Sequence, residues 1–379
     1  MRREERGRIA AVVAAIVVTI VIVLLAGNNG TPRRAPVPPP TPEAEQFGVN
    51  VNRLFDDRTY TPGQIDSELA AVRATGATLA RGDALWEATE PTPPIAGVHH
   101  YDWAFDDFQV RALARHGLTW LPIIDYSAGW AQSDAGHDHS PPSSFAAYAA
   151  YAGALAKRYG PGGTFWSEHP KLAPLPVSAY EIWNEPDNPL FWFPSPNARR
   201  YAQLYLAARA AIHAADATAH VLVGGLTLPG RFLPAMVRAA PQLAGELDGV
   251  AIHPYGPTPA AVLSNVVAAR RTLQALGLGS VPLFVTEFGW TTRPPGATDG
   301  ALEADRPAYI ERTIEALARS GCGIAATVLY TWATPERRPR DAQDWFGISP
   351  PGGGTSPDVA AFTRALRAAG GAHLATSCS

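Results

Sequence analysis

Short apolar runs alternate with longer amphipathic stretches along most of the chain. Eight apolar runs predict strands, which begin near Phe47, Ala77, Leu118, Val177, His220, Val250, Pro282 and Ile324. The stretches between them have helical spacing and predict helices near residues 62–75, 101–116, 143–159, 196–216, 230–240, 258–276, 302–320 and 356–369. A glycine closes six of these stretches, as expected where a chain leaves a helix in a left-handed conformation. Eight strands alternating with eight helices predict an α/β fold, the (β/α)8 TIM barrel.

The alternative for such alternation is an open, doubly wound sheet. The sequence has no G-x-G-x-x-G motif after the first predicted strand, which disfavours the dinucleotide-binding form of that fold. A length of 379 residues is compatible with two or three domains. The repeating pattern instead indicates one barrel domain over residues 47–375, with its active site at the carboxyl ends of the strands.

The amino-terminal segment predicts a membrane anchor over residues 1–27. Four arginines within residues 1–8 precede Ile9–Gly27, a run of 19 residues without a charge. That length is close to the roughly 20 residues of a membrane-spanning helix and exceeds the roughly 7–15 residues of a signal-peptide core. A Pro-rich linker over residues 28–46 follows. The leading arginines place the barrel domain outside the cytoplasm; the alternative is a cleaved signal peptide and a secreted protein.

Charge and cysteine content exclude several classes of protein. The net charge is −3, so the chain lacks the basic footprint of a nucleic-acid-binding protein. Two cysteines are too few for a disulfide scaffold or a Cys-rich zinc module. Outside the cytoplasm Cys322 and Cys378 can pair with each other. The alternative is one buried cysteine and one thiol in the carboxyl-terminal tail, and the sequence leaves both open.

Two predicted strands end in a carboxylate next to a tryptophan. The fourth ends in Glu181-Ile182-Trp183-Asn184-Glu185-Pro186, and the seventh ends in Thr286-Glu287-Phe288-Gly289-Trp290. Glycoside cleavage requires one carboxylic acid to protonate the leaving oxygen and one carboxylate to attack or stabilise the sugar carbon. Aromatic rings add flat apolar faces on which sugars stack. The two strand ends therefore predict a site for a carbohydrate substrate.

With these motifs the sequence resembles clan A of the retaining glycoside hydrolases, especially families 39 and 5, from about Phe47 to Trp345. The resemblance implies that Glu185 is the acid/base, that Glu287 is the nucleophile, and that Asn184 binds the sugar 2-hydroxyl. It implies no metal and no cofactor.

The resemblance extends to the supporting residues. His253-Pro254-Tyr255 in the sixth strand matches the clan's His-x-Tyr, whose tyrosine contacts the nucleophile. Arg81 matches an arginine that holds the nucleophile ionised, and Trp332 matches the aromatic floor of the central subsite. Trp290 completes the motif of the seventh strand, beside the nucleophile.

Other residues near the strand ends are weaker candidates. Asp125 and Trp130, at the end of the third strand, are expected to line the cleft, although Trp130 would also suit packing under the loop. Glu181 shares the strand parity of Glu185, which favours a buried ion pair inside the barrel with Arg81 over a third catalytic acid.

Two loops leave alternatives open. Two histidines and two aspartates in residues 133–139 have the chemistry of a divalent-metal site, but a solvated loop on the substrate side is the favoured interpretation. Phe191, Trp192 and Phe193 after the fourth strand suit either a sugar platform or a packed loop.

The sequence thus favours a membrane-anchored, retaining glycosidase that hydrolyses a β-linked poly- or oligosaccharide outside the cytoplasm. Transfer to another sugar would use the same residues. The hypothesis from a different class is a glycan-binding ectodomain without catalysis, because a barrel scaffold alone does not specify an activity.

Overall fold

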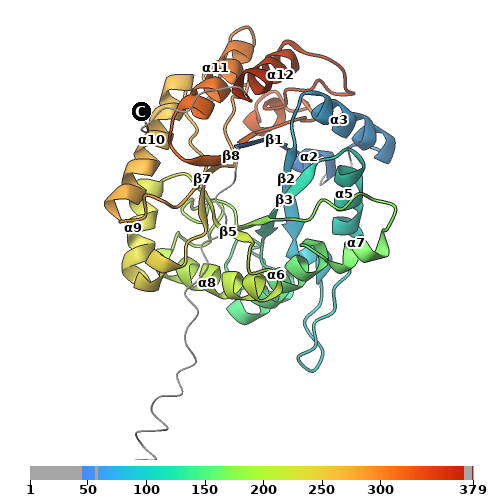
Figure 1. The fold of residues 1–379 in the computed structure, drawn as a ribbon, viewed down its shortest axis with the longest axis vertical. Coiled ribbons are helices and arrows are strands. Elements are labelled where there is room, and N and C mark those ends of the chain that lie inside the picture. The colour runs from blue at the N-terminus through green and yellow to red at the C-terminus, as the bar shows by residue number, and fades with distance from the viewer. Residues whose placement is uncertain (1–44, 56–58, 371–377, 379) are drawn as a thin grey trace, which may run out of the picture. The chain divides into compact units, whose positions relative to one another are not determined.

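The computed structural model describes residues 45–55, 59–370 and 378. In them, eight parallel strands form a closed barrel in chain order, from β1 to β8 and back to β1. Figure 1 looks along this barrel, with the strands in the centre and the helices in a ring around them. The predicted (β/α)8 barrel is confirmed.

Each predicted strand start lies within two residues of the observed one. The strands are β1 Gln46–Asn50, β2 Leu79–Leu85, β3 Thr119–Asp125, β4 Ala179–Ile182, β5 His220–Leu226, β6 Gly249–Ile252, β7 Leu283–Val285 and β8 Ile324–Leu329.

The outer ring consists of the helices predicted from the amphipathic stretches. They are α3 Pro62–Ala74, α5 Ala104–Arg115, α6 Phe145–Tyr159, α8 Ala198–Ala215, α9 Pro229–Ala239, α10 Pro259–Ala275, α11 Arg306–Arg319 and α12 Pro357–Ala369. The short helices α2 Asn52–Phe55, α4 Trp86–Thr89 and α7 Thr164–Glu168 have too few residues for a periodic pattern and were not predicted.

Polar side chains fix where the ring helices begin. Thr61, Ser144, Asn197, Thr258 and Ser356 each accept a backbone N–H from the first turn of the helix that follows. Such caps satisfy one of the N–H groups that a helix start leaves without a partner. They therefore mark where the loops that follow the strands pass into the ring helices.

The barrel interior changes from apolar to polar along the strands. Side chains two residues apart on a strand share a face. On β2, Leu79 belongs to the apolar cluster inside the barrel, and Arg81 and Asp83 follow it towards the carboxyl end. Arg81 is fully buried, whereas Asp83 reaches a cavity. The apolar layer therefore forms a floor beneath a polar site at the end where a TIM barrel carries its chemistry.

A disulfide bond joins Cys322 and Cys378. Cys322 lies just before β8, so the bond places Cys378 at the amino-terminal end of the barrel strands, opposite the polar site. This settles the pairing that the sequence left open.

None of the helices in residues 45–55 and 59–370 is both long and apolar enough to cross a membrane. The predicted anchor over residues 1–27, and the linker as far as residue 44, lie outside the described residues.

Candidate active site

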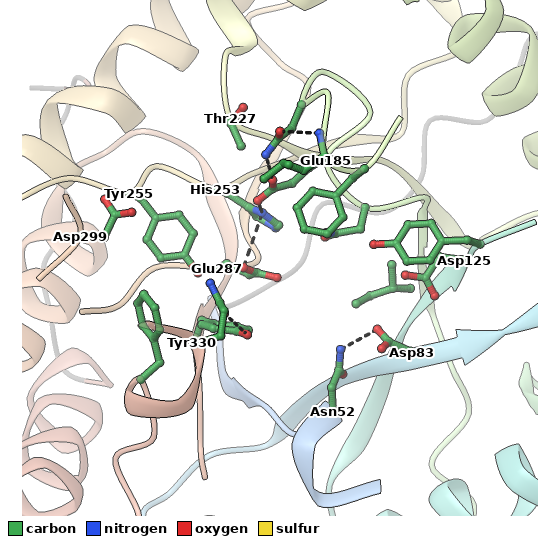
Figure 2. A pocket seen from close by; sticks show the side chains of 18 of the residues that line it. Asn52, Asp83, Asp125, Glu185, Thr227, His253, Tyr255, Glu287, Asp299 and Tyr330 are labelled. Carbon is green, nitrogen blue, oxygen red and sulfur yellow. Dashed lines mark hydrogen bonds and ion pairs between the residues drawn. The ribbon is translucent and has the colours of Figure 1, made fainter. Parts of the chain in front are cut away.

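A cavity of about 610 Å³ opens at the carboxyl ends of the barrel strands (Figure 2). Six of the residues predicted from the sequence line it: Asp125, Asn184, Glu185, His253, Tyr255 and Glu287.

Glu287 lies at the bottom of this cavity, after β7. Its Oε1 accepts a hydrogen bond from Nη1 of Arg81 at 2.5 Å, and its Oε2 accepts one from the Tyr255 hydroxyl at 2.8 Å. Burial disfavours its charge, but the positive charges of His253 and Arg81 and the hydrogen bonds from Tyr255 and Arg81 outweigh burial and lower its pKa. Glu287 is thus held as a carboxylate, the form that a nucleophile needs.

Arg81 is oriented by a second carboxylate within the barrel. Its Nε donates to Oε2 of Glu181 at 2.8 Å and its Nη2 to Oε1 at 3.1 Å, with both side chains fully buried. Nη2 also donates to Oδ1 of Asn184 at 3.0 Å. This bidentate pair leaves Nη1 directed at Glu287. The predicted pairing of Glu181 with Arg81 is confirmed.

Glu185 follows β4 and lines the cavity. Its Oε1 lies 2.7 Å from Nδ1 of His253, and its Oε2 accepts a hydrogen bond from Nδ2 of Asn188 at 2.6 Å. Glu185 has a φ of +44° and Trp183 a φ of +66°, in the left-handed region that side chains other than glycine rarely adopt. Such strained positions cluster at functional sites, where surrounding contacts maintain them.

Those contacts come from the loop after β4 and from the neighbouring strand. Asp187 accepts backbone N–H groups of Thr227 and Leu228, at 3.1 and 2.6 Å, just beyond β5. The indole N–H of Trp183 donates to the carbonyl of Phe191 at 2.6 Å. The loop is therefore fastened on both sides of Glu185.

His253 bridges the two carboxylates. Its Nδ1 lies 2.7 Å from Glu185 and 3.7 Å from Glu287, and its Nε2 lies 3.1 Å from the hydroxyl of Thr286. Burial disfavours the charged ring, but the negative charges of Glu287 and Glu185 outweigh burial and raise its pKa. Gly225 makes this position possible, because a Cβ there would lie 2.0 Å from Nε2 of the ring.

Glu185, His253 and Glu287 each place one potential metal-ligand atom within 4.8 Å of the others. Carboxylate oxygens and histidine nitrogens are ligands that zinc accepts. In this arrangement, however, these side chains form hydrogen bonds with one another and with Arg81 and Tyr255. Those hydrogen bonds also account for why the three side chains lie close together.

Three predicted tryptophans do not line the cavity. The indole N–H of Trp130 donates to the carbonyl of Glu90, and that of Trp290 to the carbonyl of Gly256. Trp332 is fully buried and donates to Oε2 of Glu68 at 2.7 Å. These rings pack beneath the loops, so the predicted aromatic floor at Trp332 is corrected.

An aromatic ring that the sequence analysis missed lies two residues before Trp332. Ala326 and Val328 of β8 belong to the apolar cluster inside the barrel, and Tyr330 continues their face into the cavity. Phe346 packs against Tyr330 with ring centroids 5.3 Å apart and lines the same wall. Tyr330 could have been predicted as a cavity residue from the period-two alternation of β8.

The wall across from Glu287 carries polar residues from β2, from β3 and from the start of α2, just after β1 (Figure 2). Asn52 donates to Asp83 at 2.6 Å, and Asp125 lies at the end of the adjacent strand. Of these, only Asp125 was predicted. Asp83 could have been predicted from strand alternation, because it shares a face of β2 with Arg81.

The histidines of the loop after β3 pack on the loop after β4. Nδ1 of His139 lies 2.6 Å from the carbonyl of Leu190, and the ring of His137 stacks on Phe193 at 3.9 Å. Phe191 lines the cavity, whereas Trp192 is buried beneath it. These loops together form one rim of the cavity. Among the residues described, the aspartates and histidines of residues 133–139 form no convergent metal-ligand set.

Comparison with solved structures finds the same barrel in glycoside hydrolases. A family 39 glycoside hydrolase from Bacteroides cellulosilyticus aligns with a TM-score of 0.63 and 18% identity over 85% of this chain and 63% of that chain. A monomeric β-xylosidase from Caulobacter crescentus aligns with a TM-score of 0.64 and 19% identity over 87% and 69%. A subfamily 18 member of family 5 from Bifidobacterium longum, in complex with Manβ1-4GlcNAc, aligns with a TM-score of 0.63 and 14% identity over 87% and 80%.

At these identities the likeness establishes a shared fold, as the sequence resemblance implied. This chain spans less than two thirds of the family 39 structure. No protein-family model matches the chain. No curated protein matches it either.

Proposed function

We propose that this protein is a glycoside hydrolase that cleaves a β-linked glycan with retention of anomeric configuration. The observation that carries the proposal is the pair of carboxyl groups at the ends of β4 and β7. Oxygens of Glu185 and Glu287 lie within 4.8 Å of each other. Retaining glycosidases have carboxyl groups about 5–5.5 Å apart, whereas inverting enzymes need about 6.5–9.5 Å to admit a water. The short separation favours retention.

In the first step, an oxygen of Glu287 attacks the anomeric carbon while Glu185 gives its proton to the glycosidic oxygen. The bond from the anomeric carbon to that oxygen breaks, the leaving sugar departs as an alcohol, and a glycosyl ester forms on Glu287. Arg81 and Tyr255 keep Glu287 ionised before the attack. Both oxygens of the nucleophile are thus oriented by donors from different strands, which fixes the carboxylate plane.

In the second step, Glu185 acts as a base. It takes a proton from water as the water oxygen attacks the anomeric carbon, and Glu287 leaves as a carboxylate. Nδ1 of His253 lies 2.7 Å from Oε1 of Glu185, so the ring orients the carboxyl group that gives and later takes the proton. If a sugar hydroxyl replaced water, the same residues would perform transfer.

We further propose that the barrel acts outside the cytoplasm, held at the membrane by residues 9–27. The disulfide between Cys322 and Cys378 supports an oxidising compartment. Membrane fractionation of the producing cells, followed by protease treatment of intact cells, tests this location. Resistance of the barrel to protease in intact cells, with digestion after lysis, would contradict it.

The test of activity is hydrolysis of aryl β-glycosides and soluble β-glycans by the full chain. The panel includes β-xylosides, β-mannosides and Manβ1-4GlcNAc, since structural neighbours are named for xyloside cleavage or hold that disaccharide. Glu287→Gln should abolish turnover. Glu185→Ala should retain the first step on substrates with good leaving groups, and azide should restore its turnover as a glycosyl azide.

The control is Glu311→Gln, which makes the same chemical change on the surface of α11, where Glu311 pairs with Arg364. It should match the wild-type protein. Glycan binding without turnover by wild type, unchanged in all variants, would overturn the proposal in favour of a binding protein.

A further inference from the structure

The carboxyl group of Glu185 has a second fixed partner besides His253. Nδ2 of Asn188 donates to Oε2 at 2.6 Å, while Oε1 lies 2.7 Å from Nδ1 of His253. Each carboxylate oxygen has two acceptor positions. One contact on each oxygen therefore fixes the plane of the group and still leaves a position for the proton that goes to the substrate.

The side chain of Asn188 can present only its N–H group to Glu185. Its Oδ1 accepts the backbone N–H of Leu190 at 3.0 Å. A flipped amide would set Nδ2 against that N–H and Oδ1 against the carboxylate, so the loop determines which atom faces the acid.

Asn188 is also the centre of the turn that follows Glu185. Its backbone N–H donates to the carbonyl of Glu185 at 2.9 Å, and its carbonyl accepts the N–H groups of Phe191 and Trp192 at 3.0 and 3.1 Å. Phe191 lines the cavity. The orientation of the acid is therefore linked to the loop that forms the cavity rim.

We propose that Asn188 is a positioning residue for the reaction, which orients Glu185 and stabilises the carboxylate that forms when Glu185 gives up its proton. The inference rests on the proposed function. A hydrogen bond from a neutral donor strengthens when its acceptor becomes charged. Asn188 thus favours proton transfer to the leaving oxygen, and its effect is largest when the leaving group needs that proton.

Asn188→Asp separates this role from the role of the loop. The substitution keeps an oxygen for the N–H of Leu190 and replaces the donor facing Glu185 with an acceptor. A carboxyl group beside a second carboxylate holds its proton more tightly. The alkaline limb of the kcat/KM profile, which reports loss of the proton from the acid, should move to higher pH.

Asn188→Ala removes the donor without adding a charge. With a poor leaving group, kcat/KM should fall about 10- to 100-fold, the range given by loss of one hydrogen bond to a charged group. With dinitrophenyl as the leaving group, kcat/KM should change little, because that group departs without a proton. A purely structural role for Asn188 would lower kcat/KM equally for both substrates.

Asn197→Asp is the matched control, since Asn197 caps α8 through its side-chain oxygen and lies outside the cavity lining. It should leave the pH profile and the leaving-group dependence unchanged. If wild type hydrolyses the aryl glycosides but Asn188→Asp and Asn188→Ala keep its pH profile and leaving-group dependence, the inference is wrong and the proposed function stands. If wild type hydrolyses no glycoside, the proposed function itself fails.

Discussion

Tyr255→Phe tests how the site keeps Glu287, the proposed nucleophile, charged. The substitution removes one hydroxyl, which donates to Oε2 of Glu287 at 2.8 Å. The ring itself would remain packed against Tyr330 and Phe346. The change is therefore confined to one hydrogen bond to the carboxylate of Glu287, a residue that is 8% exposed.

The size of the effect follows from the charge on that acceptor. A hydrogen bond to a charged group contributes about 1.5–3 kcal/mol, and each 1.4 kcal/mol corresponds to a factor of ten. Burial raises the pKa of Glu287, while His253, Arg81 and Tyr255 lower it. Without the hydroxyl the pKa rises. Since activity requires the carboxylate, the acid limb of kcat/KM should move to higher pH, with a loss of about 10- to 100-fold on that limb.

The assay is the pH dependence of kcat/KM on an aryl glycoside that the wild-type protein hydrolyses. Tyr205→Phe is the control, because its hydroxyl donates to the carbonyl of Val221 and makes no contact with Glu287. It should lower stability without moving the acid limb. An unchanged acid limb in Tyr255→Phe, or an equal displacement in both variants, would refute the reasoning.

Three further predictions concern stability, each measured by chemical denaturation. Arg81→Met leaves the buried charge of Glu181 without its cation, so the free energy of unfolding should fall by about 3–5 kcal/mol; a loss under 1 kcal/mol would contradict the pairing. Cys378→Ser removes a cross-link between residues 56 apart, and should cost about 2–4 kcal/mol while leaving kcat/KM unchanged, since Cys322 lies at the opposite end of the barrel. Burial raises the pKa of Asp106 from 3.8 to about 7. Between pH 3.8 and about 7 the unfolded state therefore loses a proton that the folded state keeps, and the free energy of unfolding should decline as the pH rises. Asp106→Asn should remove that decline, and an unaltered slope in the variant would contradict the role of Asp106.

The sequence was sufficient to predict the parts of the molecule that depend on repetition and parity. Alternating apolar runs predicted the barrel because each strand must bury both faces and each helix one. The pairing of Glu181 with Arg81 followed from strand parity and from the cost of an unpaired buried charge. The proposed catalytic pair, Glu185 and Glu287, came from motifs at two strand ends, which the closed barrel brings together.

The aromatic residues of the site could not be predicted in the same way. β8 ends at Leu329. Tyr330 follows it directly and continues its inward face into the cavity, whereas Trp332, three residues past the strand, is buried in the core. An apolar run in the sequence does not define the end of a strand to within two residues. Trp130 and Trp290 resemble sugar platforms in sequence, yet each indole N–H has a backbone carbonyl as partner. Whether a tryptophan packs or binds depends on such partners, which are distant along the chain.

The central claim is that Glu287 forms a covalent bond with the sugar. It is tested most directly with a 2-deoxy-2-fluoro aryl glycoside of the sugar that the activity panel identifies, because the fluorine slows release of the glycosyl-enzyme. After proteolysis, mass spectrometry should locate one added glycosyl group on the peptide that contains Glu287, and none in Glu287→Gln. A label on any other residue, or no label in a protein that releases its product with inverted configuration, would contradict the account.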